Sequence, residues 1–158
     1  MRKAQSLVIC TALLCSVLLA VPLAAWAHCE VPCGIYGDAN RFSDMREDIA
    51  TIEKAMKQIA ELGAASQKNY NQLVRWINTK EMHATKLQEV VWQYFLTQRV
   101  KPVAKDNPGY AAYQKKLELL HHLSVFAMKA KQGIDLAVVK KLKSLVDQFQ
   151  KAYMAKKK

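Results

Sequence analysis

The residues best suited to chemistry lie together near the amino terminus, in the stretch Ala25 to Tyr36, which reads A-W-A-H-C-E-V-P-C-G-I-Y. The A-W-A segment has small residues at the two positions that a signal peptidase reads, so cleavage after Ala27 is expected. The cut would make His28 the first residue. It would thereby gather a free α-amine, an imidazole and the thiols of Cys29 and Cys33 in one place. These are donors for a transition metal.

The spacing of these donors predicts a planar chelate. The amine and the Cys29 sulfur are joined through the Cys29 amide nitrogen, and deprotonation of that amide would close two fused five-membered rings around one ion. Cys33 can supply a fourth in-plane ligand. Nitrogen and thiolate donors in a square favour nickel(II) or copper(II) over magnesium or calcium. Two thiolates and an anionic amide also donate electron density, which stabilises nickel(III). A bound nickel ion could then alternate between nickel(II) and nickel(III) by exchanging one electron.

The two cysteines have other interpretations. In an oxidising compartment, Cys29 and Cys33 could simply form a disulfide. A Cys-x-x-x-Cys spacing is also a weak indication of zinc, although no second pair completes a tetrahedral site. The coincidence of His28 with the processing point favours metal binding over both.

Residues 1–27 have the layout of a secretory leader, with Arg2 and Lys3 followed by an apolar run from Ser6 to Leu23. An uncleaved membrane anchor is the alternative. Removing 27 of the 158 residues leaves 131, and the formal charge falls from +11 to +9 as the two leader cations depart. We expect an exported protein, periplasmic or secreted, without stable membrane association after cleavage. It would be cytoplasmic if the leader acts only as a maturation propeptide.

The remaining chain reads as helices with apolar residues at three- and four-residue steps. Asp38 is expected to cap a first helix after Gly37, and Gly63 to end it. A second helix is predicted over about 65–100, with the polar stretch 78–81 marking a kink or a solvent-facing turn. Its expected buried face comprises Tyr70, Leu73, Val74, Ile77, Leu87, Val90, Val91, Tyr94 and Phe95.

Prolines and glycines separate the later helices. Pro102 and Pro108 lie in the longest connection, where they exclude a continuous helix. A third helix is predicted over about 110–131, and Asp135 is expected to cap a fourth. The prediction is therefore an all-α fold. A leader (1–27) precedes an N-terminal metal-binding hook (28–37) and a four-helix bundle (38–158).

The sequence H-C-E-V-P-C-G-I-Y at positions 28–36 resembles the nickel hook of nickel-dependent superoxide dismutase. The pattern of that family is H-C-x-x-P-C-G-x-Y at the mature amino terminus, and all six fixed positions agree. Tyr94-Phe95 followed by a proline-bearing connection is also similar to the corresponding part of the family. The resemblance implies a small four-helix bundle assembled as a homohexamer.

The resemblance also implies roles for the hook residues. His28 would give its α-amine and, in the oxidised state, its imidazole as an axial ligand. Cys29 would give its backbone nitrogen and thiolate, and Cys33 the other thiolate. Pro32 would shape the hook. Tyr36 would stand over the open face and help to order the incoming anion or water.

Two further positions follow from counting along the family pattern. Asp44 falls where the family has an acid that holds the axial imidazole. The family commonly has an arginine near that imidazole, whereas the best local match here is His83, with Arg75 as a candidate replacement in space. The surroundings of the imidazole thus depart from the family pattern.

The function predicted is superoxide dismutation, with one nickel ion per chain cycling between nickel(II) and nickel(III) and converting superoxide to hydrogen peroxide and oxygen. The expected partner is the superoxide anion, not nucleic acid. The alternative is a noncatalytic nickel- or copper-binding helical bundle of the exported compartment. A basic bundle that binds membranes or nucleic acid is a third reading, because the sign of the net charge alone does not choose among anionic partners.

Overall fold

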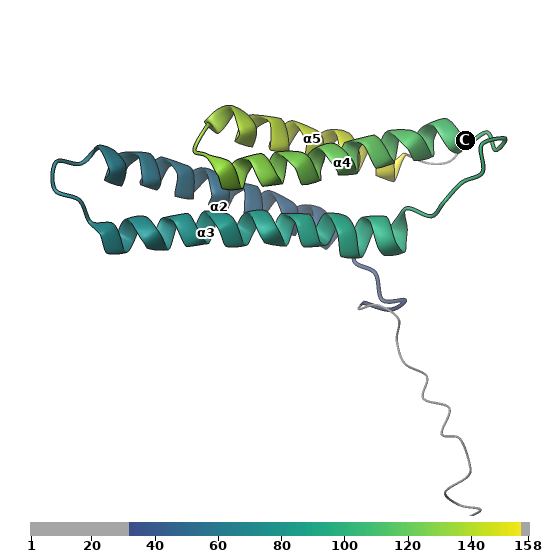
Figure 1. The fold of residues 1–158 in the computed structure, drawn as a ribbon. Helices are drawn as coiled ribbons and strands as arrows, with labels where there is room; N and C mark the ends of the chain where they lie inside the picture. Colours follow the sequence, from purple (N-terminus) through teal and green to yellow (C-terminus); the bar gives the residue numbers. More distant parts are fainter. Residues whose placement is uncertain (1–31, 156–158) are drawn as a thin grey trace, which may run out of the picture. The chain divides into compact units, whose positions relative to one another are not determined.

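The computed structural model describes residues 32–155, and these residues form helices and connecting loops without a strand. α3 and the π-helical segment η1 follow one another without a break, so the described part of the chain contains four helical rods (Figure 1). The predicted all-α four-helix bundle is confirmed. The elements are α2 (Asp38–Ala64), α3 (Tyr70–Glu89), η1 (Val90–Arg99), α4 (Tyr110–Gln132) and α5 (Leu136–Met154).

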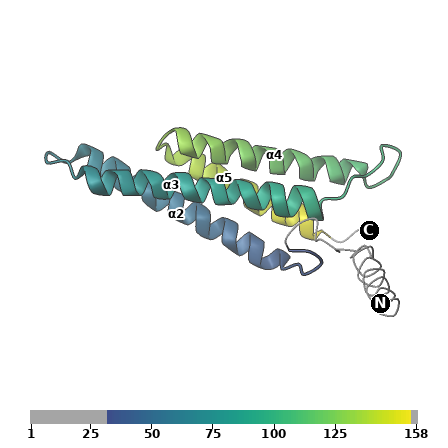
Figure 2. The same ribbon diagram turned by 60° about the horizontal axis from the view of Figure 1, so that its bottom comes forward.

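Each rod packs against two neighbours, in the order α2, α3, α4, α5 and back to α2. Figures 1 and 2 show that the α2–α3 hairpin extends past the α4–α5 pair at one end. The buried face predicted for the second helix is wrong there, because no helix covers it: Tyr70 is 70 % exposed and Val74 is 53 % exposed. None of the helices in residues 32–155 has the length and apolar content to span a membrane.

The core is richest in aromatic rings where the start of α2, η1 and the end of α5 meet. The ring of Phe42 lies 5.1 Å from that of Phe95 and 5.6 Å from that of Phe149, and Phe95 meets Phe149 edge-on at 4.8 Å. All three side chains are fully buried, and each such burial contributes about 1.5–3 kcal/mol. The cluster therefore fixes the relative positions of the elements that carry the site described below.

Helix boundaries follow the expected signals with two exceptions. Asp135 caps α5 by accepting a hydrogen bond from the amide of Ala137 at 2.8 Å, as predicted. The second helix begins at Tyr70 instead of about 65, because the Asn69 side chain caps it. The prediction that Asp38 caps the first helix is wrong. Gly37 occupies the cap position, and Asp38 is the first helical residue.

The stretch 78–81, expected to be a kink or a solvent-facing turn, is regular helix within α3. The side chain of Lys80 is only 4 % exposed. Its ammonium donates hydrogen bonds to the carbonyl oxygens of Ala130, at 2.8 Å, and Lys131. These carbonyls belong to the last turn of α4, where carbonyl oxygens have no hydrogen-bond donors within their own helix. Lys80 thus joins α3 to the carboxyl end of α4.

The last ten residues of the second rod, η1, follow a π-helical register, in which residues bond five apart instead of four. The amide of Val100 donates to the carbonyl of Phe95 at 2.8 Å. The Thr97 hydroxyl reaches the carbonyl of Trp92 at the same spacing, also at 2.8 Å. The register changes which side chains of η1 share a face.

Candidate metal centre

The described part of the hook, residues 32–37, is a non-helical lead into α2. Of the three predicted metal ligands, His28 and Cys29 lie outside the described residues, so the structure places only Cys33. Its thiol is free and exposed. Gly34, which follows, has a φ of 75°, a conformation that favours glycine and allows the chain to turn directly after Cys33.

Tyr36 is the next-to-last residue of the hook and is 40 % exposed. Its ring meets that of Tyr94 edge-on, with the centroids 6.0 Å apart. The guanidinium carbon of Arg99 lies 4.2 Å from the centroid of the Tyr36 ring, within the range of a cation–π interaction. Tyr36, which the family resemblance implies would stand over the open metal face, is therefore packed on two residues of η1.

Both of these η1 residues converge on Asp38. Arg99 donates to the carboxylate through Nε, at 2.9 Å from Oδ1, and through a terminal nitrogen, at 2.7 Å from Oδ2. The hydroxyl of Tyr94 donates to Oδ1 at 2.6 Å, and that of Tyr153 donates to Oδ2 at 2.9 Å. Each carboxylate oxygen thus accepts two hydrogen bonds. We call these four residues, Asp38, Tyr94, Arg99 and Tyr153, the Asp38 cluster.

The residues of the Asp38 cluster stabilise one another's ionisation states. The hydrogen bonds from Arg99 outweigh the opposing effect of burial and lower the pKa of Asp38 to about 2. The same hydrogen bonds raise the pKa of Arg99. Burial, together with the adjacent carboxylate, raises the pKa of Tyr94 and of Tyr153 to about 12. At neutral pH the cluster is an ion pair with two neutral phenols.

The π register explains how Tyr94 and Arg99 reach the same carboxylate. In an α-helix, each residue advances about 100°, so side chains five apart would point about 140° away from one another. Hydrogen bonding between residues five apart instead places these residues roughly one above the other. Tyr94 and Arg99 are five apart, and both bond Asp38 from η1.

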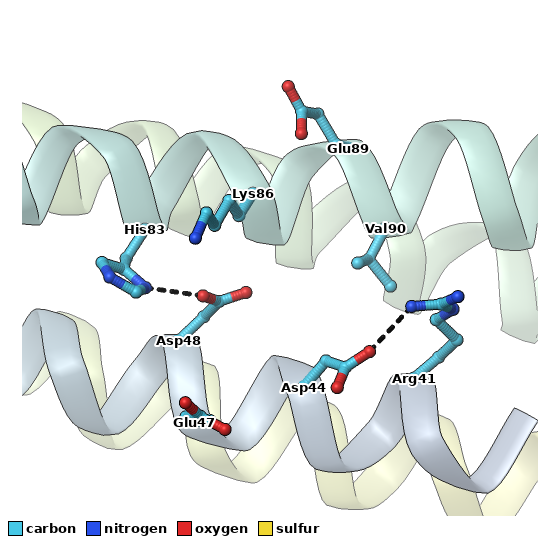
Figure 3. Close-up of a pocket in the computed structure, with 8 residues that line it drawn as sticks. All are labelled: Arg41, Asp44, Glu47, Asp48, His83, Lys86, Glu89 and Val90. Atoms are coloured by element: carbon cyan, nitrogen blue, oxygen red, sulfur yellow. Dashed lines mark hydrogen bonds and ion pairs between the residues drawn. The ribbon is translucent and has the colours of Figure 1, made fainter.

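Asp44 and His83 border one cavity of about 320 Å³ between α2 and α3 (Figure 3). They do not bond one another. The carboxylate of Asp44, 45 % exposed, pairs with Arg41 at 2.9 Å. His83 Nδ1 lies 2.7 Å from a carboxylate oxygen of Asp48, whose side chain is 10 % exposed. Arg75, the other residue considered near the imidazole, is not among those that line the cavity.

Arg41 connects this cavity with the surroundings of Tyr36. Besides pairing with Asp44, it places its guanidinium carbon 5.3 Å from the centroid of the Tyr94 ring, the ring that meets Tyr36. Figure 3 shows Lys86 directed toward Asp48, while Glu89 points away from the gap between the helices. Burial raises the pKa of Asp48 against the opposing effect of His83.

Sequence reasoning missed several residues that the fold brings to this region. Asp48 was not singled out, and Asp38 was taken for a cap. Arg99 and Tyr153 carry no local signal at all, because their partner is 61 and 115 residues away in the chain. The one available sign was Asp38 directly after a hook that ends in Tyr36-Gly37, which marks the point where hook and bundle meet.

Cys33, the one proposed ligand among the described residues, fits a soft transition metal at the hook. Cys33 presents an exposed sulfur, directly before a glycine in the left-handed conformation. Thiolate sulfur is a ligand for nickel, copper or zinc and not for magnesium or calcium. Within residues 32–155, no three His, Cys, Asp or Glu side chains form a group that could hold a metal ion.

Comparison with known proteins agrees with the hook. A protein-family model described as nickel-containing superoxide dismutase matches residues 23–157, which include the hook and the whole described bundle. Neither the curated proteins nor the solved structures searched gave a match.

Proposed function

The chain belongs to the nickel-containing superoxide dismutase family, and from that premise we propose that His28, Cys29 and Cys33 hold one nickel ion per chain. The protein is an oxidoreductase that uses nickel and converts superoxide to hydrogen peroxide and oxygen. The observation that carries the assignment of ligands is the hook sequence H-C-E-V-P-C-G-I-Y, with all six fixed positions present, inside the matched residues. The free, exposed thiol of Cys33 supports it.

When bound, nickel supplies the one-electron exchange between its +2 and +3 states that dismutation requires. The residues of the chain do the rest. Tyr36 lies near the end of the hook with its ring packed on Tyr94 and Arg99, and its hydroxyl would help to order the incoming superoxide or a water molecule. The packing on two η1 residues supports this role, because contacts with Tyr94 and with Arg99 together fix the position of the Tyr36 ring.

We also propose that Asp44 would hold the imidazole of His28 when nickel is bound. Support comes from the position of Asp44 at the rim of the cavity between α2 and α3, with almost half of its side chain exposed. Its hydrogen bond from Arg41, at 2.9 Å, orients the carboxylate. His83, paired with the buried Asp48 of α2, takes the place on α3 where the family pattern commonly has an arginine.

The leader and the assembly complete the proposal. Cleavage after Ala27 frees the amine of His28, and the leader layout supports export to the periplasm or the medium. We propose a homohexamer. The uncovered apolar side chains of Tyr70, Val74 and Ile77 support an assembly, because they remain exposed on the isolated chain. The molar mass measured in solution by light scattering tests the hexamer.

The decisive experiment is to add one residue before His28. The addition turns the α-amine into an amide, which removes one ligand while leaving the bundle untouched. We expect loss of nickel-dependent superoxide removal with an unchanged circular dichroism spectrum. The matched control adds one residue after the carboxyl-terminal Lys158. Full activity in the amino-terminal variant would overturn the proposed ligand set.

Two measurements on the unaltered protein accompany this test. Mass spectrometry should place His28 at the mature terminus, and metal analysis should return close to one nickel per chain. The paramagnetic resonance spectrum of the oxidised protein should show low-spin nickel(III) with an axial nitrogen. The noncatalytic alternative predicts bound nickel or copper without any acceleration of superoxide decay.

A further inference from the structure

Tyr36 depends on Arg99 for its position. It lies in a non-helical segment in which Ile35 is 83 % exposed, and the ring contacts that the structure gives it both come from η1. Tyr94 meets the ring only edge-on, at 6.0 Å between centroids. The guanidinium of Arg99 lies closer, 4.2 Å from the ring centroid. Arg99 therefore provides the nearer of the two supports.

Arg99 is itself fixed. Two of its nitrogens bond the two oxygens of Asp38, at 2.9 and 2.7 Å, so the plane of the guanidinium is set by the carboxylate. Asp38 stands two residues after Tyr36 and begins α2, which the aromatic core holds in place. The hydroxyls of Tyr94 and Tyr153 occupy the remaining positions on the carboxylate. The bundle thus supports the Tyr36 ring through the Asp38–Arg99 ion pair.

We propose that Arg99, oriented by Asp38, is the positioning residue that sets the place of the Tyr36 ring beside the metal centre. The inference rests on the proposed role of Tyr36. Arg99 acts here through its plane, not through its charge, because Asp38 neutralises that charge at short range. An arginine that attracted superoxide from solution would need an unpaired charge. The π register of η1 is the structural device that brings Arg99 to this position.

The first test uses the metal-free protein, so its outcome does not depend on activity. The Nε proton of Arg99 should give a nuclear magnetic resonance signal protected from exchange by Asp38 and shifted upfield by the Tyr36 ring. Tyr36→Leu should move that signal downfield, whereas Tyr36→Phe, which keeps the ring, should not. Tyr36 is 40 % exposed, so neither change threatens the fold. An identical signal in all three proteins would overturn the proposal.

The second test uses the nickel-loaded enzyme and Arg99→Lys, which keeps the charge but lacks the planar fork. We expect kcat/KM to fall about two- to fivefold, because the lysine ammonium cannot reproduce the flat guanidinium surface that Asp38 holds against the Tyr36 ring. The nickel content, and the dependence of kcat/KM on ionic strength, should stay unchanged. In a Tyr36→Leu background, the same change should cause no further loss. Arg46→Lys is the matched control, since Arg46 also pairs with a carboxylate of another helix, Asp147, at 2.8 Å but is exposed.

The outcomes separate the two proposals. An unaltered protein that binds no nickel or removes no superoxide would overturn the proposed function and this inference with it. An active protein in which Arg99→Lys costs the same factor with and without the Tyr36 ring would overturn the inference alone. A shallower dependence on ionic strength in Arg99→Gln, which removes the charge, than in wild type would instead assign Arg99 to attraction of the anion and would also overturn it.

Discussion

Asp38→Asn should destabilise the fold by an amount that depends on pH. Asparagine keeps the shape of the side chain but has no charge and only one acceptor oxygen, so it leaves Arg99 without its counter-ion. The pKa of Asp38 falls from 3.8 to about 2 on folding. Since each pKa unit corresponds to about 1.4 kcal/mol, the ionised carboxylate contributes at most about 2.5 kcal/mol. The side chain keeps 21 % exposure, and solvent screening reduces the expected value to about 1–2 kcal/mol.

The direction of the pH effect follows from the lowered pKa. A carboxylate with a lower pKa in the folded state stabilises the fold fully above the unfolded pKa and loses that contribution as the pH falls toward the folded pKa. The difference in unfolding free energy between wild type and Asp38→Asn should therefore be constant above about pH 5. It should shrink to roughly half at pH 3, midway through the window from 3.8 to about 2.

Urea titrations followed by circular dichroism provide the measurement. At pH 7, the midpoint of Asp38→Asn should lie about 0.5–1 M urea below that of wild type. Asp147→Asn is the control. It removes another carboxylate paired with an arginine, at 2.8 Å, but its side chain is 69 % exposed, so we expect less than about 0.5 kcal/mol. Equal stabilities of wild type and Asp38→Asn at pH 7, or a difference that persists undiminished at pH 3, would refute the reasoning.

Two further substitutions test other parts of the structure by the same titrations. Asp48→Asn should show the opposite pH trend, because burial raises the pKa of Asp48: the charge opposes folding at pH 7, and the variant should gain on wild type as the pH rises from 4 to 7. A variant that instead loses ground over that range would contradict this account. Lys80→Met should cost about 1–3 kcal/mol, because two carbonyls at the end of α4 lose their donor. Unchanged stability would mean that water replaces the ammonium there.

The sequence was enough for the bundle because the information for it is local. Apolar residues at helical spacing, Pro102 and Pro108 in the long connection and the Asp135 cap all act within one or two turns of the chain. The prediction of the family also rested on local information, since nine consecutive residues carried the hook pattern. The family match over residues 23–157 confirms that prediction. The placement of the nickel ligands stays a prediction, because only Cys33 lies among the described residues.

What could not be read from the sequence is the set of contacts between distant segments. Lys80 looks like a solvent-facing residue in a polar stretch until α4 ends against it. Nothing near position 44 shows that the residue meeting His83 is Asp48, one turn further along α2. The face of α3 that starts at Tyr70 has the periodicity of a buried stripe, yet the α4–α5 pair does not extend over it. Periodicity predicts an apolar face but not the length of the helix that covers it.

The π register is the clearest case of a local rule yielding to a distant partner. An α-helical continuation over residues 90–99 would satisfy the backbone equally well, and the sequence pattern favours it. It would also turn Arg99 away from Tyr94 by about 140°, leaving Asp38 with half of its donors. In η1, Tyr94 and Arg99 instead bond one carboxylate and both meet the Tyr36 ring. On the proposed ligand set and the proposed role of Tyr36, a hook grafted onto an ordinary α-helical bundle would keep the metal donors and lose the Arg99 contact with the Tyr36 ring. We therefore expect nickel binding to survive a change in η1 that lowers turnover.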